Sequence, residues 1–446
     1  MGFRETRLRI LTLRPNSKVH WLSYALGVHV CGDAEGAIGA LDSYAGTLEE
    51  GSKEFSKGFE SSELALYKNS VLSEIMDGED ELVGVKKALG HLEDIQPLLV
   101  DKTGSLQTKL SYQLQLGMFD QAKDTCILLF ERGCTEDHRV HGAYMCALVK
   151  CDRETCSQVE KLRGTGTLAT MRPLSDDERS ILISAYSSSD DTTNNLSARF
   201  PRSAAMKRIY LTLLLSSSED FRASIDKYCQ KQLVRGVPSL GSDLSSLYLI
   251  ERSNRYVLAK DPVDIKSHPV YKQLVELVDS YINSLSSHNT FPNDPTEHPP
   301  STLLWSWYLR CKLHAQAAEY ADGIALVDKC IDHTPTGVDF YELKANLLER
   351  GGDIQQAADV VDAGRDLDHQ DRYINNQTTK TLLRAGREED AKKRISMFAI
   401  HEGDPEQNLY DMQCTWFELE LADSCRKRGQ LGRSLRKYSK LCLTAG

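Results

Sequence analysis

The chain has 446 residues and a formal net charge of −10, with 54 basic and 64 acidic side chains. This acidic balance argues against a molecule that binds nucleic acid over its whole surface, and no apolar run approaches the ~20 residues of a membrane-spanning helix. We therefore expect neither a membrane nor a specific nucleic-acid sequence among its partners. The twelve cysteines form no CxxC pair, so we interpret them as reduced, expect no metal site, and predict a cytoplasmic protein.

The first part of the chain carries a repeated pattern of small residues. Ala25 is followed twelve residues later by Ala37, and Ala88 lies 34 residues before Ala122. A period of 34 is that of the tetratricopeptide (TPR) repeat, in which two antiparallel helices cross closely at small side chains. Residues 1–150 are therefore predicted to be TPR repeats that begin in mid-repeat.

The middle of the chain is less regular. Residues 151–199 are predicted to be an irregular insertion or loop, because the run Ser187–Asn195 is polar and too poor in apolar residues to bury itself. Residues 200–290 are predicted to be a helical connecting region. Residues 291–300 contain four prolines, which predicts an extended Pro-rich connection.

Residues 301–446 show the clearest repeat and are predicted to be further TPR repeats. Small residues recur every 34 positions at one slot: Gly323, Ala357 and Ala391. A second small slot lies twelve residues before each of them: Cys311, Ala345 and Thr379. Ala422 and Ser434 continue both slots after an insertion of nine residues, which we place around residues 402–408. Since each repeat buries its apolar face on the next, we predict an all-α solenoid of TPR-type hairpins, a right-handed superhelix forming an open ring.

Catalytic chemistry finds little support in the sequence. Gly164, in the stretch 161–166, could belong to a loop that binds the phosphates of acetyl-CoA or a dinucleotide at a helix N-terminus, but the residues before it lack a strand pattern. The acids Glu388, Glu389 and Asp390 stand at a helix start, where the helix dipole favours solvated carboxylates. We therefore predict that the chain is not an enzyme.

A basic segment lies near the end of the chain. From Ser424 to Lys440 there are seven basic residues and no acidic one. The spacing places Arg433, Arg436 and Lys437 on one face of a helix. Two interpretations remain open: a solvated face with cations at a helix C-terminus, or a polyanion pocket whose clustered guanidiniums chelate phosphate oxygens.

Three stretches stand out as a set: P-P-S-T-L-L-W at 299–305, D-R-Y-I-N at 371–375 and N-L-x-x-M-Q-C-x-W-F at 408–417. Together with shorter matches from about residue 14 to residue 440, they resemble the large auxiliary subunit of the NatA-type N-terminal acetyltransferase complex. The match is poorest over residues 152–199. The family's amino-terminal repeats and its later helices are absent, so we expect a fragment of a longer protein.

The resemblance implies a non-catalytic scaffold. Such a subunit wraps and activates a small acetyltransferase-fold catalytic subunit for co-translational N-terminal acetylation at the ribosome, a contact expected to be weaker here because terminal regions are missing. Acetyl-CoA would enter only through the catalytic partner, and the chain would have no cofactor of its own.

The resemblance also implies inositol hexakisphosphate as a structural ligand. Arg426 and Lys427 keep the charge of a family motif, whereas Cys425 stands where the family commonly has a tyrosine, and His401 lies near the place of a family arginine. The candidate ligand-binding residues are therefore Arg426, Lys427, His401, Arg433, Arg436 and Lys437.

An alternative is a different TPR adaptor, such as a chaperone-binding cochaperone. Its peptide-carboxylate clamp would need lysine and asparagine together on the concave face of the repeats. The nearest candidates are Lys68 with Asn69, and Lys344 with Asn346, but neither pair is well placed relative to the helix-crossing slots.

Overall fold

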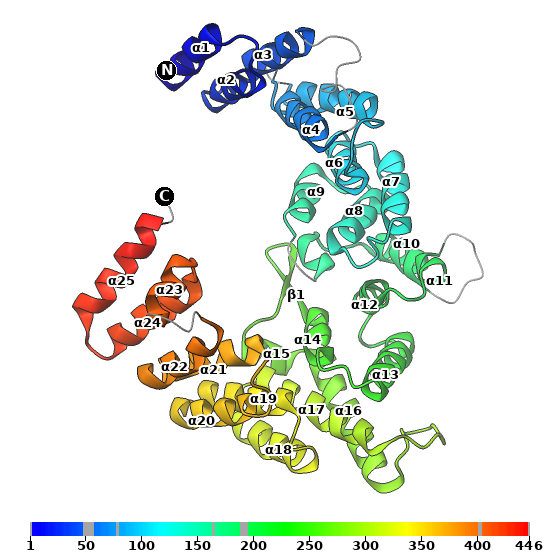
Figure 1. Ribbon diagram of the computed structural model, residues 1–446. Helices are drawn as coiled ribbons and strands as arrows, with labels where there is room; N and C mark the ends of the chain where they lie inside the picture. The colour runs from blue at the N-terminus through cyan, green and yellow to red at the C-terminus, as the bar shows by residue number, and fades with distance from the viewer. Residues whose placement is uncertain are drawn as a thin grey trace. The chain divides into compact units, whose positions relative to one another are not determined.

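The computed structural model describes residues 2–47, 58–76, 80–162, 166–187, 195–399 and 404–444, and helices dominate it (Figure 1). The chain forms two compact units. Unit 1 comprises Met1–Leu215 and Leu249–Leu258, and unit 2 comprises Ser216–Tyr248 and Ala259–Gly446. The chain therefore leaves unit 1, returns to it for ten residues and then enters unit 2 again.

Unit 1 is a series of helices that pack on their neighbours in sequence, for example α2 on α3, α4 on α5, and α6 on α7 on α8. Its helices are α1 (Gly2–Leu13), α2 (Lys18–Val30), α3 (Ala34–Gly46), α4 (Phe59–Ser73), α5 (Val83–Ile95), α6 (Lys102–Gln115), α7 (Phe119–Glu131), α8 (His138–Val149), α9 (Arg153–Glu160), α10 (Asp176–Tyr186), α11 (Leu196–Arg199) and α12 (Ala204–Leu213), with a 3-10 turn η2 (Thr167–Thr170). The stretch 151–199, predicted as an irregular insertion, thus contains α9, α10 and α11.

Helix starts in unit 1 follow from the local sequence. Asp33 precedes α3, and its carboxylate accepts a hydrogen bond of 2.8 Å from the backbone N–H of Gly36. Asp101 does the same before α6, with the N–H of Gly104 at 2.8 Å. Each cap satisfies a backbone donor that lacks a partner inside the helix, which fixes where the helix begins.

A β-hairpin interrupts the helices and corrects the expectation of a helical connecting region over 200–290. Strands β1 (Leu249–Arg252) and β2 (Arg255–Leu258) pair antiparallel and belong to unit 1. The two turn residues, Ser253 and Asn254, both have positive φ, 50° and 58°. A two-residue turn of this kind matches the twist of the strands, but Ser-Asn is a weaker sequence signal for it than Asn-Gly. The hydroxyl of Tyr256 accepts a hydrogen bond of 2.9 Å from Arg179 of α10, which anchors the hairpin within unit 1.

In unit 2, α17 to α22 pack stepwise on one another (Figure 1). Its helices are α13 (Glu219–Val234), α14 (Leu240–Leu244), α15 (Pro262–Ser267), α16 (Pro269–His288), α17 (Pro300–Gln316), α18 (Tyr320–His333), α19 (Val338–Gly351), α20 (Ile354–Arg365), α21 (Arg372–Arg384), α22 (Glu388–Ile395), α23 (Pro405–Asp411), α24 (Thr415–Lys427) and α25 (Leu431–Thr444), with 3-10 turns η3 (Ser245–Leu247) and η4 (Ser396–Phe398). Residues 289–299 connect α16 to α17, so the predicted Pro-rich connection over 291–300 ends one residue inside α17. The short helix α23 overlaps the stretch 402–408 in which the sequence predicts an insertion.

The small residues proposed for helix crossings are all buried: Ala25, Ala37, Ala88, Ala122, Cys311, Gly323, Ala345, Ala357, Thr379, Ala391, Ala422 and Ser434. At Gly323 a Cβ atom would lie 3.2 Å from the methyl carbons of Leu347 on the neighbouring hairpin. The hydroxyl of Thr379 donates to the carbonyl of Asn375 at 2.8 Å, so this polar residue is satisfied within its own helix. The all-α fold of helical hairpins is confirmed; the right-handed superhelix and the open ring stay predictions.

The end of unit 2 has a compact apolar core that positions the basic segment. Phe417, Leu421 and Cys425 line one face of α24 and are fully buried. They pack with Leu382 and Leu383 of α21. Helix α25 lies against α24, so the core fixes the side chains that these two helices carry.

Candidate polyanion site at the C-terminal helices

The basic segment Ser424–Lys440 spans the end of α24 and most of α25. Gly429, with φ of 75°, supports the tight turn between the two helices, because this conformation is strained for residues with a Cβ. The turn and the crossing at Ala422 and Ser434 bring the cations of both helices to one region of unit 2. Each cation has a different environment there.

Arg426 and Lys427 share one carboxylate at the surface. Arg426 forms an ion pair of 2.6 Å with Asp423, and Lys427 one of 3.2 Å with the same residue. The hydrogen bond from Arg426 lowers the pKa of Asp423 below its ordinary value, with Lys427 adding to the effect. Both cations are about half exposed, with exposed fractions of 56% and 51%. One negative charge therefore faces two accessible positive charges.

Arg433 instead points into the structure, toward Glu388 of α22. The guanidinium donates to the carboxylate with a distance of 2.8 Å between Nη1 and Oε2, and a second hydrogen bond joins Nη2 to Oε1. Arg428 and Lys392 also contact this carboxylate, Lys392 at 2.9 Å. The Glu388 side chain is 5% exposed. Burial alone raises the pKa of Glu388, but the hydrogen bonds from Arg433, Lys392 and Arg428 outweigh it and lower that pKa to about 2.

Lys437 is buried, and two carboxylates surround it. Its Nζ lies 3.0 Å from Oε2 of Glu418 on α24 and also contacts Glu406 of α23. Burial lowers the pKa of Lys437, but the hydrogen bonds that its ammonium donates to Glu406 and Glu418 more than compensate, so that the pKa is raised and the lysine is charged. We call the whole set the carboxylate network: Glu388, Glu406 and Glu418 with Lys392, Arg428, Arg433 and Lys437.

The six candidate residues thus do not form one accessible cluster in the described part of unit 2. Arg426 and Lys427 lie at the surface beside Asp423, and Arg436 is exposed with no ion pair among the described residues. Arg433 and Lys437 belong to the carboxylate network. His401 lies outside the described residues. A role of these residues in binding a ligand stays a prediction.

Sequence reasoning missed the acidic side of this site. The prediction that Glu388 is a solvated acid at a helix start is wrong, because the side chain is buried among three cations. Its neighbour Glu389 is exposed, as expected. The sequence signal that could have revealed this contact is the 34-residue period, because it places Glu388 in the repeat adjacent to the basic segment.

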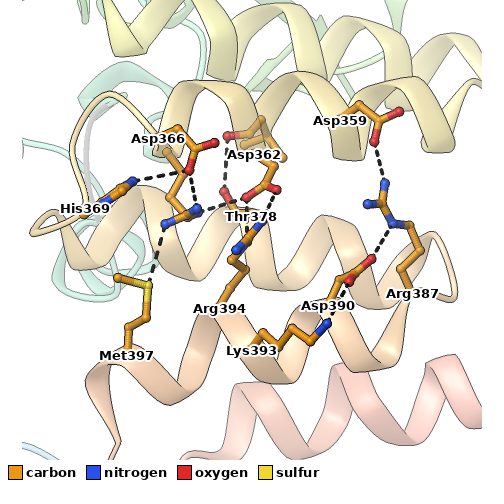
Figure 2. Close-up of polar contacts among 12 residues, drawn as sticks. Asp359, Asp362, Asp366, His369, Thr378, Arg387, Asp390, Lys393, Arg394 and Met397 are labelled. Atoms are coloured by element: carbon orange, nitrogen blue, oxygen red, sulfur yellow. Dashed lines mark hydrogen bonds and ion pairs between the residues drawn. The ribbon is translucent and has the colours of Figure 1, made fainter.

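The other cations at α22 pair with acids outside the carboxylate network. Arg394 forms two hydrogen bonds with Asp362 of α20, at 2.8 and 2.6 Å (Figure 2). Lys393 lies 4.0 Å from Asp390 on its own helix. Figure 2 also shows Arg387 reaching Asp359 on α20. The pairs of Arg394 and Arg387 join α22 to α20, and Lys393 pairs within its own helix, so of the described cations on α22 only Lys392 enters the carboxylate network.

Three of the four residues considered for a peptide clamp are already engaged, and the fourth, Asn346, is exposed. Lys68 forms an ion pair with Asp42, and Lys344 lies 2.7 Å from Asp328. Asn69 is buried, and its side-chain amide donates to the carbonyl of Ala88 at 2.7 Å. A clamp at these positions would have to break such contacts, so the structure favours a packing role for them.

The described residues offer neither a membrane-spanning helix nor a metal site. No helix there combines the length and the apolarity needed to cross a bilayer. No group of three or more His, Cys, Asp or Glu side chains in that part of the chain is arranged to hold a metal ion. Gly164, weighed in the sequence as part of a phosphate loop, lies outside the described residues.

Comparison with known proteins gives concordant matches. A family model described as N-terminal acetyltransferase A, auxiliary subunit, matches residues 59–442. An Arabidopsis thaliana protein, N-terminal acetyltransferase A complex auxiliary subunit NAA15, is 32% identical over 98% of this chain and 43% of its own length. Human N-alpha-acetyltransferase 16, NatA auxiliary subunit, is 26% identical over 98% of this chain and 44% of its own length. The chain therefore spans less than half the length of these curated relatives.

Among solved structures, the following match resembles the fold over almost the whole chain. A chain from the complex of Naa15/Naa10 bound to HypK-THB aligns with 99% of this chain and 57% of its own length, with a TM-score of 0.73 and 24% sequence identity. At this level of identity the likeness establishes the helical fold. What that chain assembles with is a property of that complex.

Proposed function

Because the chain belongs to the family of auxiliary subunits of N-terminal acetyltransferase A, we propose that it is a non-catalytic scaffold that wraps and activates a small acetyltransferase-fold catalytic subunit. The observation that carries this proposal is the family match over residues 59–442. Membership confirms the resemblance read from residues 299–305, 371–375 and 408–417. It also agrees with the prediction of an auxiliary subunit rather than an enzyme.

The partner and the setting follow from the same reasoning. The solved complex of Naa15/Naa10 supports a catalytic partner of the acetyltransferase class for this chain. Stacked helical hairpins offer long concave surfaces suited to holding such a partner. We also propose that the assembled complex works in the cytoplasm at the ribosome, on emerging N-termini.

Co-expression with the catalytic subunit of the same organism tests the scaffold role. We expect a one-to-one complex in size-exclusion chromatography, and faster acetylation of Ser- and Ala-starting peptides than by the catalytic subunit alone. The purified chain alone is expected to transfer no acetyl group from acetyl-CoA. Acetyl-transfer activity that co-purifies with the chain in the absence of the catalytic subunit would contradict the scaffold assignment. A chain that elutes separately from the catalytic subunit would contradict the proposed partnership.

We further propose that inositol hexakisphosphate or a similar polyanion binds at the end of α24 and on α25. The support is the pair Arg426 and Lys427, which are half exposed and share a single carboxylate. Guanidinium and ammonium groups form strong hydrogen bonds with phosphate oxygens, and a ligand of high negative charge would compete well with one aspartate.

Charge reversal tests this proposal. The double variant R426E/K427E is expected to bind inositol hexakisphosphate at least about tenfold more weakly in isothermal titration calorimetry, because two charge-assisted contacts become repulsive. The matched control is K86E/K87E, an adjacent exposed lysine pair on α5 of unit 1, of which Lys86 also lies near an aspartate. Equal affinities of R426E/K427E and the control would remove Arg426 and Lys427 from the site.

A further inference from the structure

Glu406 occupies an unusual position in the carboxylate network. Its Oε2 atom lies 3.2 Å from Nζ of Lys392 and 3.6 Å from Nη2 of Arg433, and its other oxygen contacts Lys437. Cations from α22 and from α25 therefore converge on one carboxylate of α23. Burial alone raises the pKa of Glu406, but Lys437 and Lys392 outweigh it and lower that pKa, so the side chain is ionised.

The helix that carries Glu406 is the least firmly packed of those in the network. Helix α23 has seven residues, and Leu409 is the buried one among them. Glu388 and Glu418, in contrast, belong to α22 and α24, which also carry the buried crossing residues Ala391 and Ala422. The exposed fraction of Glu406 is 18%, against 5% for Glu388 and 1% for Glu418. Glu406 is therefore the carboxylate that can leave with the smallest loss of packing.

We propose that Glu406 is a built-in counter-ion that closes a latent phosphate site made by Lys392, Arg433 and Lys437. A soluble polyphosphate ligand binds there by displacing Glu406, and α23 detaches with it. The inference rests on the proposed polyanion function and adds its regulation: the affinity for the ligand depends on how often α23 is displaced.

The charge and the number of acceptor oxygens of a phosphate group favour its exchange for Glu406. A phosphate group carries roughly −1.5 to −2 charges and three strong acceptor oxygens, whereas Glu406 supplies one charge and two oxygens. The network contains four cations and three carboxylates among the described residues, so the removal of Glu406 leaves an excess of two positive charges. The released carboxylate returns to water, where its charge is solvated.

The test is calorimetric titration of the full chain with inositol hexakisphosphate. The variant E406Q keeps the size of the side chain and removes its charge, so we expect an affinity about three- to tenfold above that of the unsubstituted chain, because a competing internal state is removed. The matched control is D411N on the same helix, whose carboxylate accepts a hydrogen bond from Gln407 and has no ion pair within the described residues. It makes the same change in net charge, and its affinity is expected to stay within about twofold.

Two further variants keep the test decisive. L409A weakens the docking of α23 without changing any charge and is also expected to raise the affinity, which covers the case in which E406Q does not fold. Adding K392Q to E406Q is expected to lower the affinity again, since Lys392 is then a direct ligand contact. If E406Q/K392Q binds the ligand as tightly as E406Q, Lys392 does not contact the ligand and the assignment of the site is wrong.

The outcomes separate this inference from the proposed function. If the unsubstituted chain binds and both E406Q and L409A bind equally or more weakly, the inference is wrong and the polyanion proposal stands. If none of the chains binds, both are wrong. Tighter binding of E406Q to vesicles containing phosphatidylinositol bisphosphate than to the soluble ligand would overturn the choice of a soluble ligand.

Discussion

Replacement of Glu388 by glutamine is expected to lower the free energy of unfolding of unit 2 by about 3–5 kcal/mol. The side chain is 5% exposed, and Arg428, Arg433 and Lys392 all contact its carboxylate. Without the negative charge these cations stay close together, partly desolvated and without their main counter-ion, which is the costly way to break an ion network.

Urea denaturation followed by tryptophan fluorescence measures this effect, since Trp305, Trp307 and Trp416 lie in unit 2. The control is E389Q, which removes the exposed neighbouring carboxylate of the same helix and is expected to change the stability by less than about 0.5 kcal/mol. A loss no larger for E388Q than for E389Q would show that the network contributes nothing to stability.

The same variant has a characteristic pH dependence. The folded-state pKa of Glu388 is lowered from 4.5 to about 2, so its contribution to stability is present above pH 4.5 and is lost as the pH falls toward 2. The difference in unfolding free energy between the unsubstituted chain and E388Q should therefore be constant near neutral pH and shrink below about pH 4.5. A difference that grows on acidification would contradict the lowered pKa.

Truncation of Phe417 to alanine is the second large expected effect, again about 3–5 kcal/mol of unfolding free energy. The ring is fully buried in the core that α24 shares with α21, where it packs with Leu382, Leu421 and Cys425. Removing it withdraws apolar contacts and leaves a cavity that long, mutually packed helices close only in part.

Leu419 provides the control on the same helix. It is 45% exposed, so L419A is expected to cost much less, within about 1 kcal/mol. Thermal or urea unfolding of both variants measures the difference. Similar losses for F417A and L419A would mean that α24 does not pack on α21 as described.

The helix crossings could be predicted from the sequence because they join helices that follow one another along the chain. The slots of Gly323, Ala357 and Ala391 recur every 34 residues, and each hairpin packs on the one before it. The β-hairpin was not predicted, since Ser253 and Asn254 carry only a weak turn signal, and the strands gain their stability from contacts such as the one between Tyr256 and Arg179.

The electrostatic character of the candidate site could not be predicted from charge counts along the chain. The segment Ser424–Lys440 contains no acid, yet Glu388 lies 45 positions before Arg433 and accepts two hydrogen bonds from it. Linear spacing shows which cations share a helix face, but it does not show which carboxylates the packing of several helices brings to that face.

The sequence by itself determined the class of this protein: small residues at a fixed period specify helical hairpins, and ordered motifs specify the auxiliary-subunit family. Both can be recognised from residue types and their spacing along the chain, without knowing which distant residues are in contact. Only the tertiary structure decided which cations are accessible. Burial strengthens the attraction between Glu388 and Arg433 and between Glu418 and Lys437. Arg426, in contrast, stays at the surface. The distances between these charges are set by how α22, α23, α24 and α25 pack, which linear spacing does not show.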